Sequence, residues 1–252
     1  MILGFLGDVY MEQQFKLLSN NMLKIIAAIA MVLDHVGHMF FPMVGLLRII
    51  GRIAFPIFAY MIAEGCKYTR NKFRYFLLMF IIGAACQVVY YVAMHNIFMN
   101  ILLTFSLSVI LIYTMQTVKK VVFTHKSVKN SIVAILVFAL MIVGVYFLTK
   151  YVSFDYGFFG VMLPVFASLF HSIDKSNPSK LDNKWVSVGT FSVGLLLLCL
   201  YSNILYCYYS FLAVPLLLCY SGERGRLNLK YFFYVFYPVH LGLIYLIRLL
   251  LF

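Results

Sequence analysis

Long apolar stretches alternate with short polar segments along most of this chain, and this pattern predicts membrane-spanning helices. A transmembrane helix needs about 20 mostly apolar residues, with a range of about 17–25. The stretches that meet this length are 22–42, 46–66, 74–94, 97–116, 130–149, 156–172, 186–202, 204–220 and 231–251. The seventh and eighth have only Ser202 and Asn203 between them, so their junction is the weakest point of the assignment.

The composition agrees with this pattern. Hydrophobic residues make up 64% of the 252 residues and charged residues only 11%, whereas soluble domains carry about 25% charged residues. A water-soluble enzyme, a disordered chain and a secreted disulfide scaffold are therefore excluded. The predicted fold class is all-α, a polytopic membrane helical bundle of about nine transmembrane helices, formed as a single domain over 22–252 after an interfacial N-terminal segment, 1–21.

The distribution of charge predicts the orientation in the membrane. With a cytoplasmic N-terminus and nine spans, the inner segments hold all of the 20 Lys and Arg residues except Arg48, Arg52, Lys150 and Arg248. Lys and Arg favour cytoplasmic loops, so we expect a multi-pass protein of the cell membrane, the inner membrane in a bacterium. The net charge of +12 is then assigned to topology and lipid headgroups, and no nucleic-acid partner is expected.

Three ionisable residues lie near the middle of the first predicted span. They are Asp34, His35 and His38, within the segment LKIIAAIAMVLDHVGHMFF. A charge at the centre of a membrane helix costs at least about 2.5–3.5 kcal/mol, so such residues normally face the protein interior or a wet cavity. On a helix, Asp34 and His35 point about 100° apart, so Asp34 is not expected to orient His35, and an Arg of a neighbouring helix is a candidate partner instead. An internal ion pair that only holds helices together remains the alternative to a functional site.

The second predicted span carries two arginines on one helical face, Arg48 and Arg52. Guanidinium groups within a membrane need an anion nearby, and the candidates are Asp34, a bound phosphate and a developing oxyanion. Snorkelling to the outer interface is the alternative for both side chains. Pro56 is expected to kink this helix, and Pro238 has the same effect beside an intramembrane histidine, His240, in the last span.

A polar cluster at the inner end of the second span is a candidate site for an anionic cytosolic ligand such as a nucleotide. Contact with lipid headgroups is the alternative. The residues of the cluster are Glu64, Lys67, Tyr68, Arg70, Asn71, Lys72 and Arg74. The sequence contains no Walker, HExxH, GxSxG or CxxC motif, so a hydrolase or an ATPase is not predicted.

Three blocks of this chain resemble the TraX family of membrane proteins. They are LKIIAAIAMVLDHVGHMFFP, LRIIGRIAFPIFAYMIAEGCKYTRNKFRY and KYFFYVFYPVHL, which together cover about a quarter of the sequence. The family is known from conjugation systems, where one member is associated with N-terminal acetylation of pilin, and it is similar to the broader transmembrane acyltransferases. Type-3 members of that group carry an Arg and a His separated by ten residues in their first helix; here Lys24 and His35 have this spacing.

The resemblance implies an integral membrane acyltransferase with acetyl-CoA or another acyl-CoA as cosubstrate. His35 is implied as the catalytic histidine. Our assignments for the other residues are a catalytic role for Asp34, substrate binding by His38, Arg48, Arg52 and His240, and acyl-CoA binding by the polar cluster with Lys24 and Lys230. The acceptor is a peptide, a glycan or a small molecule.

Two other classes of function stay open at this point. A proton-coupled secondary transporter also needs buried Asp and His residues on proline-broken helices. A non-catalytic membrane scaffold is the third class, but it has no need of the ionisable residues at Asp34 and His35.

Overall fold

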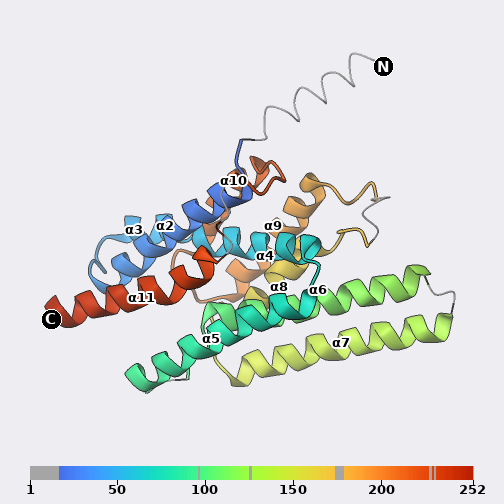
Figure 1. Ribbon diagram of the computed structural model, residues 1–252, viewed down its shortest axis with the longest axis horizontal. Helices are drawn as coiled ribbons and strands as arrows, with labels where there is room; N and C mark the ends of the chain where they lie inside the picture. Colours follow the sequence, from blue (N-terminus) through green and yellow to red (C-terminus); the bar gives the residue numbers. More distant parts are fainter. Residues whose placement is uncertain are drawn as a thin grey trace, which may run out of the picture. The chain divides into compact units, whose positions relative to one another are not determined.

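The computed structural model describes residues 17–95, 97–124, 127–173, 179–226, 229 and 231–251. Within these ranges the regular structure is helical, apart from two isolated β-bridges. Figure 1 shows the helices, whose bounds are α2 Asn20–Met39, α3 Gly45–Gly51, α4 Ala54–Tyr68, α5 Lys72–Met94, α6 Ile101–Thr124, α7 Val128–Tyr151, α8 Gly157–Ser168, α9 Lys184–Tyr201, η1 Cys207–Leu212, α10 Ala213–Leu218 and α11 Phe232–Leu251. The predicted all-α fold is confirmed. The predicted interfacial segment 1–21 falls mainly on residues outside the described ranges.

Seven described segments are long and apolar enough to cross a membrane: α2, α3 together with α4, α5, α6, α7, α9 and α11. The two other predicted spans, 156–172 and 204–220, correspond to shorter apolar helices. The 12 residues of α8 rise only about 18 Å, well short of the roughly 30 Å hydrocarbon core. The stretch 204–220 divides into a 3₁₀ turn and a six-residue helix. The predicted seventh span is a continuous 18-residue helix. Of the two spans on either side of Ser202 and Asn203, only the eighth therefore lacks a helix long enough to cross the membrane.

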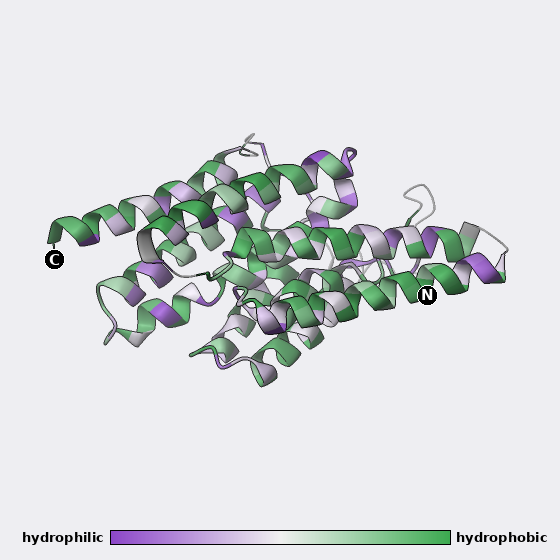
Figure 2. Ribbon diagram, turned by 90° about the horizontal axis from the view of Figure 1, so that it is seen from below, coloured by the Kyte–Doolittle hydropathy of each residue, from purple (hydrophilic) through white to green (hydrophobic). Residues whose placement is uncertain are grey.

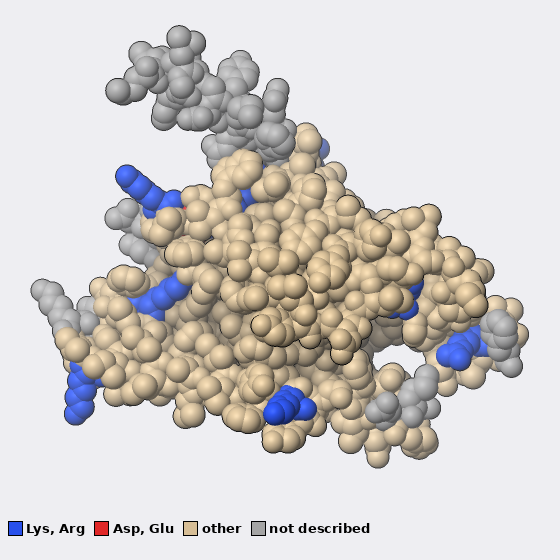
Figure 3. Space-filling view, turned by 180° about the vertical axis from the view of Figure 1, so that it is seen from behind, with Lys and Arg blue, Asp and Glu red and all other residues tan. Residues whose placement is uncertain are grey.

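The surface of the helices is mostly hydrophobic. Figure 2 shows hydrophobic residues along nearly every helix. Figure 3 shows Lys and Arg as separate patches on a face that is otherwise neither basic nor acidic. Helix α7 has no buried residue along its 24 residues, yet its sequence is strongly apolar. These are the properties expected of helices that have lipid rather than water as their neighbour.

The chain divides into two compact units. The first consists of Met1–Met61 and Leu205–Phe252, and the second of Ile62–Ile204; α4 begins in the first and ends in the second. In the first unit, α2 packs against both α3 and α11. Ser19 caps the start of α2 by accepting a hydrogen bond from the backbone N–H of Met22.

In the second unit, α6 packs against α5, α7 and α8, and α9 packs against α8. Buried hydroxyl groups join these helices to one another. Ser108 of α6 donates to the carbonyl of Val161 at 2.7 Å, and Ser187 of α9 donates to the carbonyl of Ala167 at 2.7 Å. Polar side chains of this kind link helices in membranes, where the packing gains little from the hydrophobic effect.

The contact between α2 and α3 depends on glycine. A Cβ on Gly37 would lie 2.7 Å from the Cβ of Leu47, and a Cβ on Gly51 would lie 2.8 Å from the backbone Cα of Asp34. Contacts under 3 Å to backbone force the helices apart. Both glycines therefore set the distance between these helices, and with it the position of Asp34 relative to the second span.

The close approach at Gly51 gives a first testable prediction. Gly51→Ala should lower the free energy of unfolding by about 1–3 kcal/mol because the added methyl group collides with α2. The matched control is Gly144→Ala on α7, where a Cβ would meet nothing within 4 Å and where the higher helix propensity of Ala makes the change neutral or slightly stabilising. Thermal unfolding of the purified variants in detergent measures both effects. Equal melting temperatures for the two variants would contradict the role given to Gly51.

Candidate functional site

Asp34 is the centre of a charged network in the first unit. Nη2 of Arg52 contacts both carboxylate oxygens of Asp34 at 2.5 Å, and Nε of Arg48 lies 3.0 Å from Oδ1 of Asp34. Arg52 is only 5% exposed, so its charge is compensated inside the protein rather than by snorkelling. Of the candidate partners that the sequence left open for these arginines, the structure shows Asp34.

The backbone of the second span explains how both arginines reach the same carboxylate. Arg48 lies within α3, and Arg52 forms its C-cap, with its N–H donating to the carbonyl of Arg48 at 3.1 Å. Helix α4 begins at Ala54. Pro56 has no N–H to donate to the carbonyl four residues earlier, which is why the helix breaks at Arg52 and Ile53, one turn before the proline itself.

A second contact joins the first span to the last. Nδ1 of His35 lies 3.2 Å from Nε2 of His240, and the two ring centroids are 5.2 Å apart. His240 is 5% exposed; its Nδ1 lies 2.9 Å from the carbonyl oxygen of Phe236, and its ring stacks on that of Phe236 at 4.8 Å. The histidine beside Pro238 is therefore part of the same site as the first span.

His38 extends this arrangement towards the surface. Nη1 of Arg48 lies 2.6 Å from Nδ1 of His38, whose side chain is exposed. Because a guanidinium only donates, Nδ1 of His38 is the acceptor. Arg48 thus contacts both His38 and Asp34, and the fold brings together every residue that we assigned to catalysis or substrate binding: Asp34, His35, His38, Arg48, Arg52 and His240.

Lys24 lies on α2 but away from this group. Its Nζ lies 5.6 Å from the ring centroid of Phe233 on α11, in a cation–π arrangement. The eleven residues from Lys24 to His35 correspond to about 16 Å of helix rise, so the two side chains do not touch. Lys230, the other predicted ligand-binding residue near α11, lies outside the described residues.

The remaining residues of the predicted acyl-CoA site belong to the second unit, and several have structural partners. Asn71 caps α5 by accepting from the N–H of Arg74 at 2.9 Å. Nζ of Lys72 donates to Gln116 at 2.7 Å and lies over the ring of Tyr113. Arg70 and Arg74 have exposed side chains. Lys72 is exposed as well, but its ammonium group is held by Gln116 and Tyr113, so Arg70 and Arg74 are the stronger candidates for contact with a ligand.

Lys67 and Glu64 belong to a buried polar group that the sequence analysis did not recognise. Nζ of Lys67 lies 2.6 Å from Oδ1 of Asp182, whose other oxygen accepts from the N–H of Ser172 at 3.0 Å. Burial alone raises the pKa of Asp182, but the hydrogen bonds from Lys67 and Ser172 outweigh it and hold the pKa below its ordinary value. Nothing in the local sequence of Asp182 shows that it lies against α4.

His171 is the second member of this group that sequence reasoning missed. It lies three residues beyond α8, outside the seven candidate spans, and is 6% exposed. Burial, with a further contribution from the Lys67 charge, lowers its pKa from 6.5 to about 4. His171 is therefore uncharged at neutral pH, and its 3.7 Å contact with Glu64 is not an ion pair there. Nζ of Lys119 donates to the carbonyls of Leu169 and His171 at 2.5 and 3.2 Å, which holds the end of α8.

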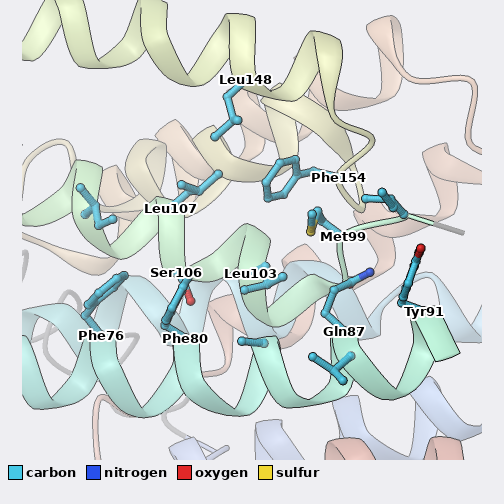
Figure 4. Close-up of a pocket in the computed structure, with 14 residues that line it drawn as sticks. Phe76, Phe80, Gln87, Tyr91, Met99, Leu103, Ser106, Leu107, Leu148 and Phe154 are labelled. Carbon is cyan, nitrogen blue, oxygen red and sulfur yellow. The ribbon is translucent and has the colours of Figure 1, made fainter.

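The second unit also contains an apolar cavity of about 630 Å³ beside α6. Figure 4 shows side chains from α5, α6 and α7, with Met99 and Phe154 of the connecting segments, directed towards it. Its lining contains Gln87, Tyr91 and Ser106 but no Asp, Glu, His, Lys or Arg. The cavity therefore suits an apolar chain and offers no acid or base for a reaction.

The shifted pKa of His171 predicts how stability depends on pH. Below pH 6.5 the unfolded chain takes up a proton on this imidazole that the folded protein does not accept until about pH 4. The folded state should therefore lose roughly 1 kcal/mol per pH unit as the pH falls from 6 to 5. His171→Gln cannot titrate, so the difference in unfolding free energy between wild type and variant should change across this interval.

Chemical denaturation in detergent at several pH values measures this difference. The control is His95→Asn, which replaces an exposed histidine whose φ of 50° asparagine tolerates and leaves the buried His171 in place. A pH-independent difference for His171→Gln would mean that His171 is not buried in its neutral form.

Comparison with known proteins identifies the family. The TraX protein family model matches residues 19–248. Comparisons with curated proteins and with solved structures found no match. No group of three or more His, Cys, Asp or Glu residues in the described part of the chain could hold a metal ion. Since the family match extends from the start of α2 into the last turn of α11 and includes the whole His35–Asp34 network, the chain belongs to the TraX protein family.

Proposed function

We propose that this protein is a membrane acyltransferase that passes an acyl group from acyl-CoA to an amine or hydroxyl acceptor. Acetyl-CoA is the first donor to test, and a peptide N-terminus, a glycan and a small molecule are the acceptor classes. The observation that carries the proposal is the position of His35. Its imidazole is hydrogen-bonded on one side to His240, and the preceding residue, Asp34, holds two guanidinium groups in place.

The reaction needs a base at the acceptor. His35 takes a proton from the acceptor N–H or O–H while the acceptor atom attacks the thioester carbonyl. The tetrahedral intermediate then collapses with cleavage of the C–S bond, and the CoA thiolate leaves with the proton that His35 returns. One C–N or C–O bond replaces one C–S bond, and the products are the acylated acceptor and CoA with a free thiol.

The negative charge that develops on the carbonyl oxygen needs positive groups nearby. Arg48 and Arg52 are the candidates, because both are fixed within the membrane by Asp34 and so need no reorganisation during the reaction. In this proposal Asp34 acts by positioning these guanidiniums. The partial exposure of Arg48 and the exposure of His38 favour these two side chains for contact with the incoming substrate.

The proposed donor site rests on charge and exposure. The diphosphate and ribose phosphate of acyl-CoA call for cations at the cytoplasmic side, and the exposed Arg70 and Arg74 are the strongest candidates. Lys24, with its Nζ over Phe233, and Lys230 are further candidates near α11. Glu64, Lys67, Asn71 and Lys72 support this part of the proposal less, since the contacts of these residues serve the packing of the second unit.

A proton-coupled transporter fits the network less well. In such a protein, a buried carboxylate exchanges protons with the transported substrate or with water. Here the guanidiniums of Arg48 and Arg52 already occupy the carboxylate of Asp34. Flux into proteoliposomes in the absence of acyl-CoA would favour the transporter over the enzyme.

We also propose a topology with a cytoplasmic N-terminus and nine crossings in a bacterial cell membrane, as the distribution of Lys and Arg favours. The segment between α8 and α9 distinguishes nine crossings from seven. With nine it is cytoplasmic, because α8 crosses; with seven it is external. Lys180→Cys should therefore react with a membrane-impermeant maleimide only after the cells are permeabilised, compared with the unsubstituted protein as background. Labelling in intact cells would contradict the nine-span topology.

The catalytic proposal predicts that purified wild-type protein transfers labelled acetyl from acetyl-CoA and that His35→Gln does not. Loss of a general base typically costs 10²–10⁴-fold in rate. His95→Asn, at the exposed end of α5, should keep full activity, and melting temperatures establish that all three proteins are folded. Mass spectrometry of the product identifies the acceptor. Full transfer by a folded His35→Gln protein would show that His35 is not the base.

A further inference from the structure

We infer that His240 is a positioning residue that fixes the tautomer of His35, so that Nε2 of His35 is the basic nitrogen. The inference about the proton stands on contacts in the first unit. Only its consequence for the reaction rests on the proposed function.

The proton on His240 is located by its backbone contact. Nδ1 of His240 lies 2.9 Å from the carbonyl oxygen of Phe236. A carbonyl oxygen can only accept, so Nδ1 must carry the hydrogen. In neutral imidazole the other nitrogen then has a lone pair, and Nε2 of His240 is an acceptor.

The tautomer of His35 follows from this assignment. Nε2 of His240 lies 3.2 Å from Nδ1 of His35, and an acceptor at that distance requires a donor opposite it. Nδ1 of His35 therefore carries the hydrogen, and its Nε2 has the lone pair. A single backbone carbonyl thus determines the proton positions on two imidazoles of different helices.

The local structure holds His240 in this orientation. Phe236 and His240 are four residues apart on α11, so the carbonyl and the ring lie on the same face. The rings of Phe236 and His240 stack at an interplanar angle of 10°, while Tyr237 packs edge-on against the same imidazole. A buried, stacked ring has few alternative rotamers, so its Nε2 remains directed at His35.

The other polar neighbours of His35 are engaged elsewhere. The carboxylate of Asp34 contacts Arg48 and Arg52, and Nδ1 of His38 accepts from Arg48. His240 is therefore the residue with which Nδ1 of His35 forms its hydrogen bond in the described part of the chain. When Nε2 of His35 takes the acceptor proton, Nδ1–H keeps its bond to His240, which steadies the imidazolium that forms. This is the task that a third residue behind a catalytic histidine performs in acyl transfer.

Two substitutions separate this role from simple packing. In His240→Gln, the side-chain amide reaches the place of Nε2 and can offer an oxygen to His35. In His240→Asn, the shorter amide reaches only the place of Nδ1, so the bond to Phe236 can form but the acceptor for His35 is lost. The two variants are similar in polarity and differ in the atom that the inference concerns.

The first measurement is ¹⁵N magnetic resonance of the full-length protein labelled at histidine, with His35 assigned from the spectrum of His35→Gln. We expect His35 to carry its proton on Nδ1 in wild type and in His240→Gln, and to lose this preference in His240→Asn. A His35 protonated on Nε2 in wild type would overturn the inference, as would the same tautomer in all three proteins. If His240→Asn does not fold, the wild-type and His240→Gln spectra alone decide the matter.

The second measurement is acetyl transfer. His240→Asn should lower kcat by about 10²-fold with little change in KM for acetyl-CoA, because it alters the base and not the donor site; His240→Gln should recover most of the loss. Equal losses in both folded variants would show a packing role instead. The spectra need no turnover. Protein that carries the Nδ1 proton on His35 but transfers no acetyl group would refute the proposed function and leave the proton assignment intact.

Discussion

The ion pair between Asp34 and two arginines is the interaction on which the rest of the first unit depends. A lone carboxylate or guanidinium inside a membrane is costly, so neither helix could hold its charge without the other. The pairing requires α2 and α3 to approach closely, and Gly37 and Gly51 make that approach possible. The buried ion pair therefore requires the close contact between α2 and α3, and that contact in turn requires glycine at positions 37 and 51.

This constraint also decides where His35 points. Adjacent residues on a helix project about 100° apart, so a helix that turns Asp34 towards α3 turns His35 towards a different neighbour. That neighbour is α11, where His240 meets it at 3.2 Å. The acid does not act on the adjacent histidine directly. The pairing of Asp34 with the arginines fixes the rotation of α2 about its axis. In this rotation the imidazole of His35 lies next to His240 of the last span.

The second unit shows how the same residue types can serve packing alone. Asp182, Lys67, His171 and Glu64 form a buried group much like that around Asp34. Here, however, Asp182 also accepts from the backbone N–H of Ser172, and the nearby Lys119 donates to backbone carbonyls just beyond α8. Buried charges that are satisfied in this way stabilise a chain reversal. Burial of an ionisable residue is therefore insufficient to identify a site, and the partners of that residue must also be known.

From the sequence alone, we could predict the helical membrane fold, the isolated charges of the first two spans and an arginine as a candidate partner of Asp34, because hydropathy, insertion cost and helical spacing are local properties. The contact between His35 and His240 could not be predicted, since 205 positions separate the two residues and neither local sequence indicates which helix it packs against. The same is true of Asp182 and of the short helix α8. Only the tertiary structure decides which face of each helix meets which neighbour, because that choice minimises the cost of all the buried polar groups together.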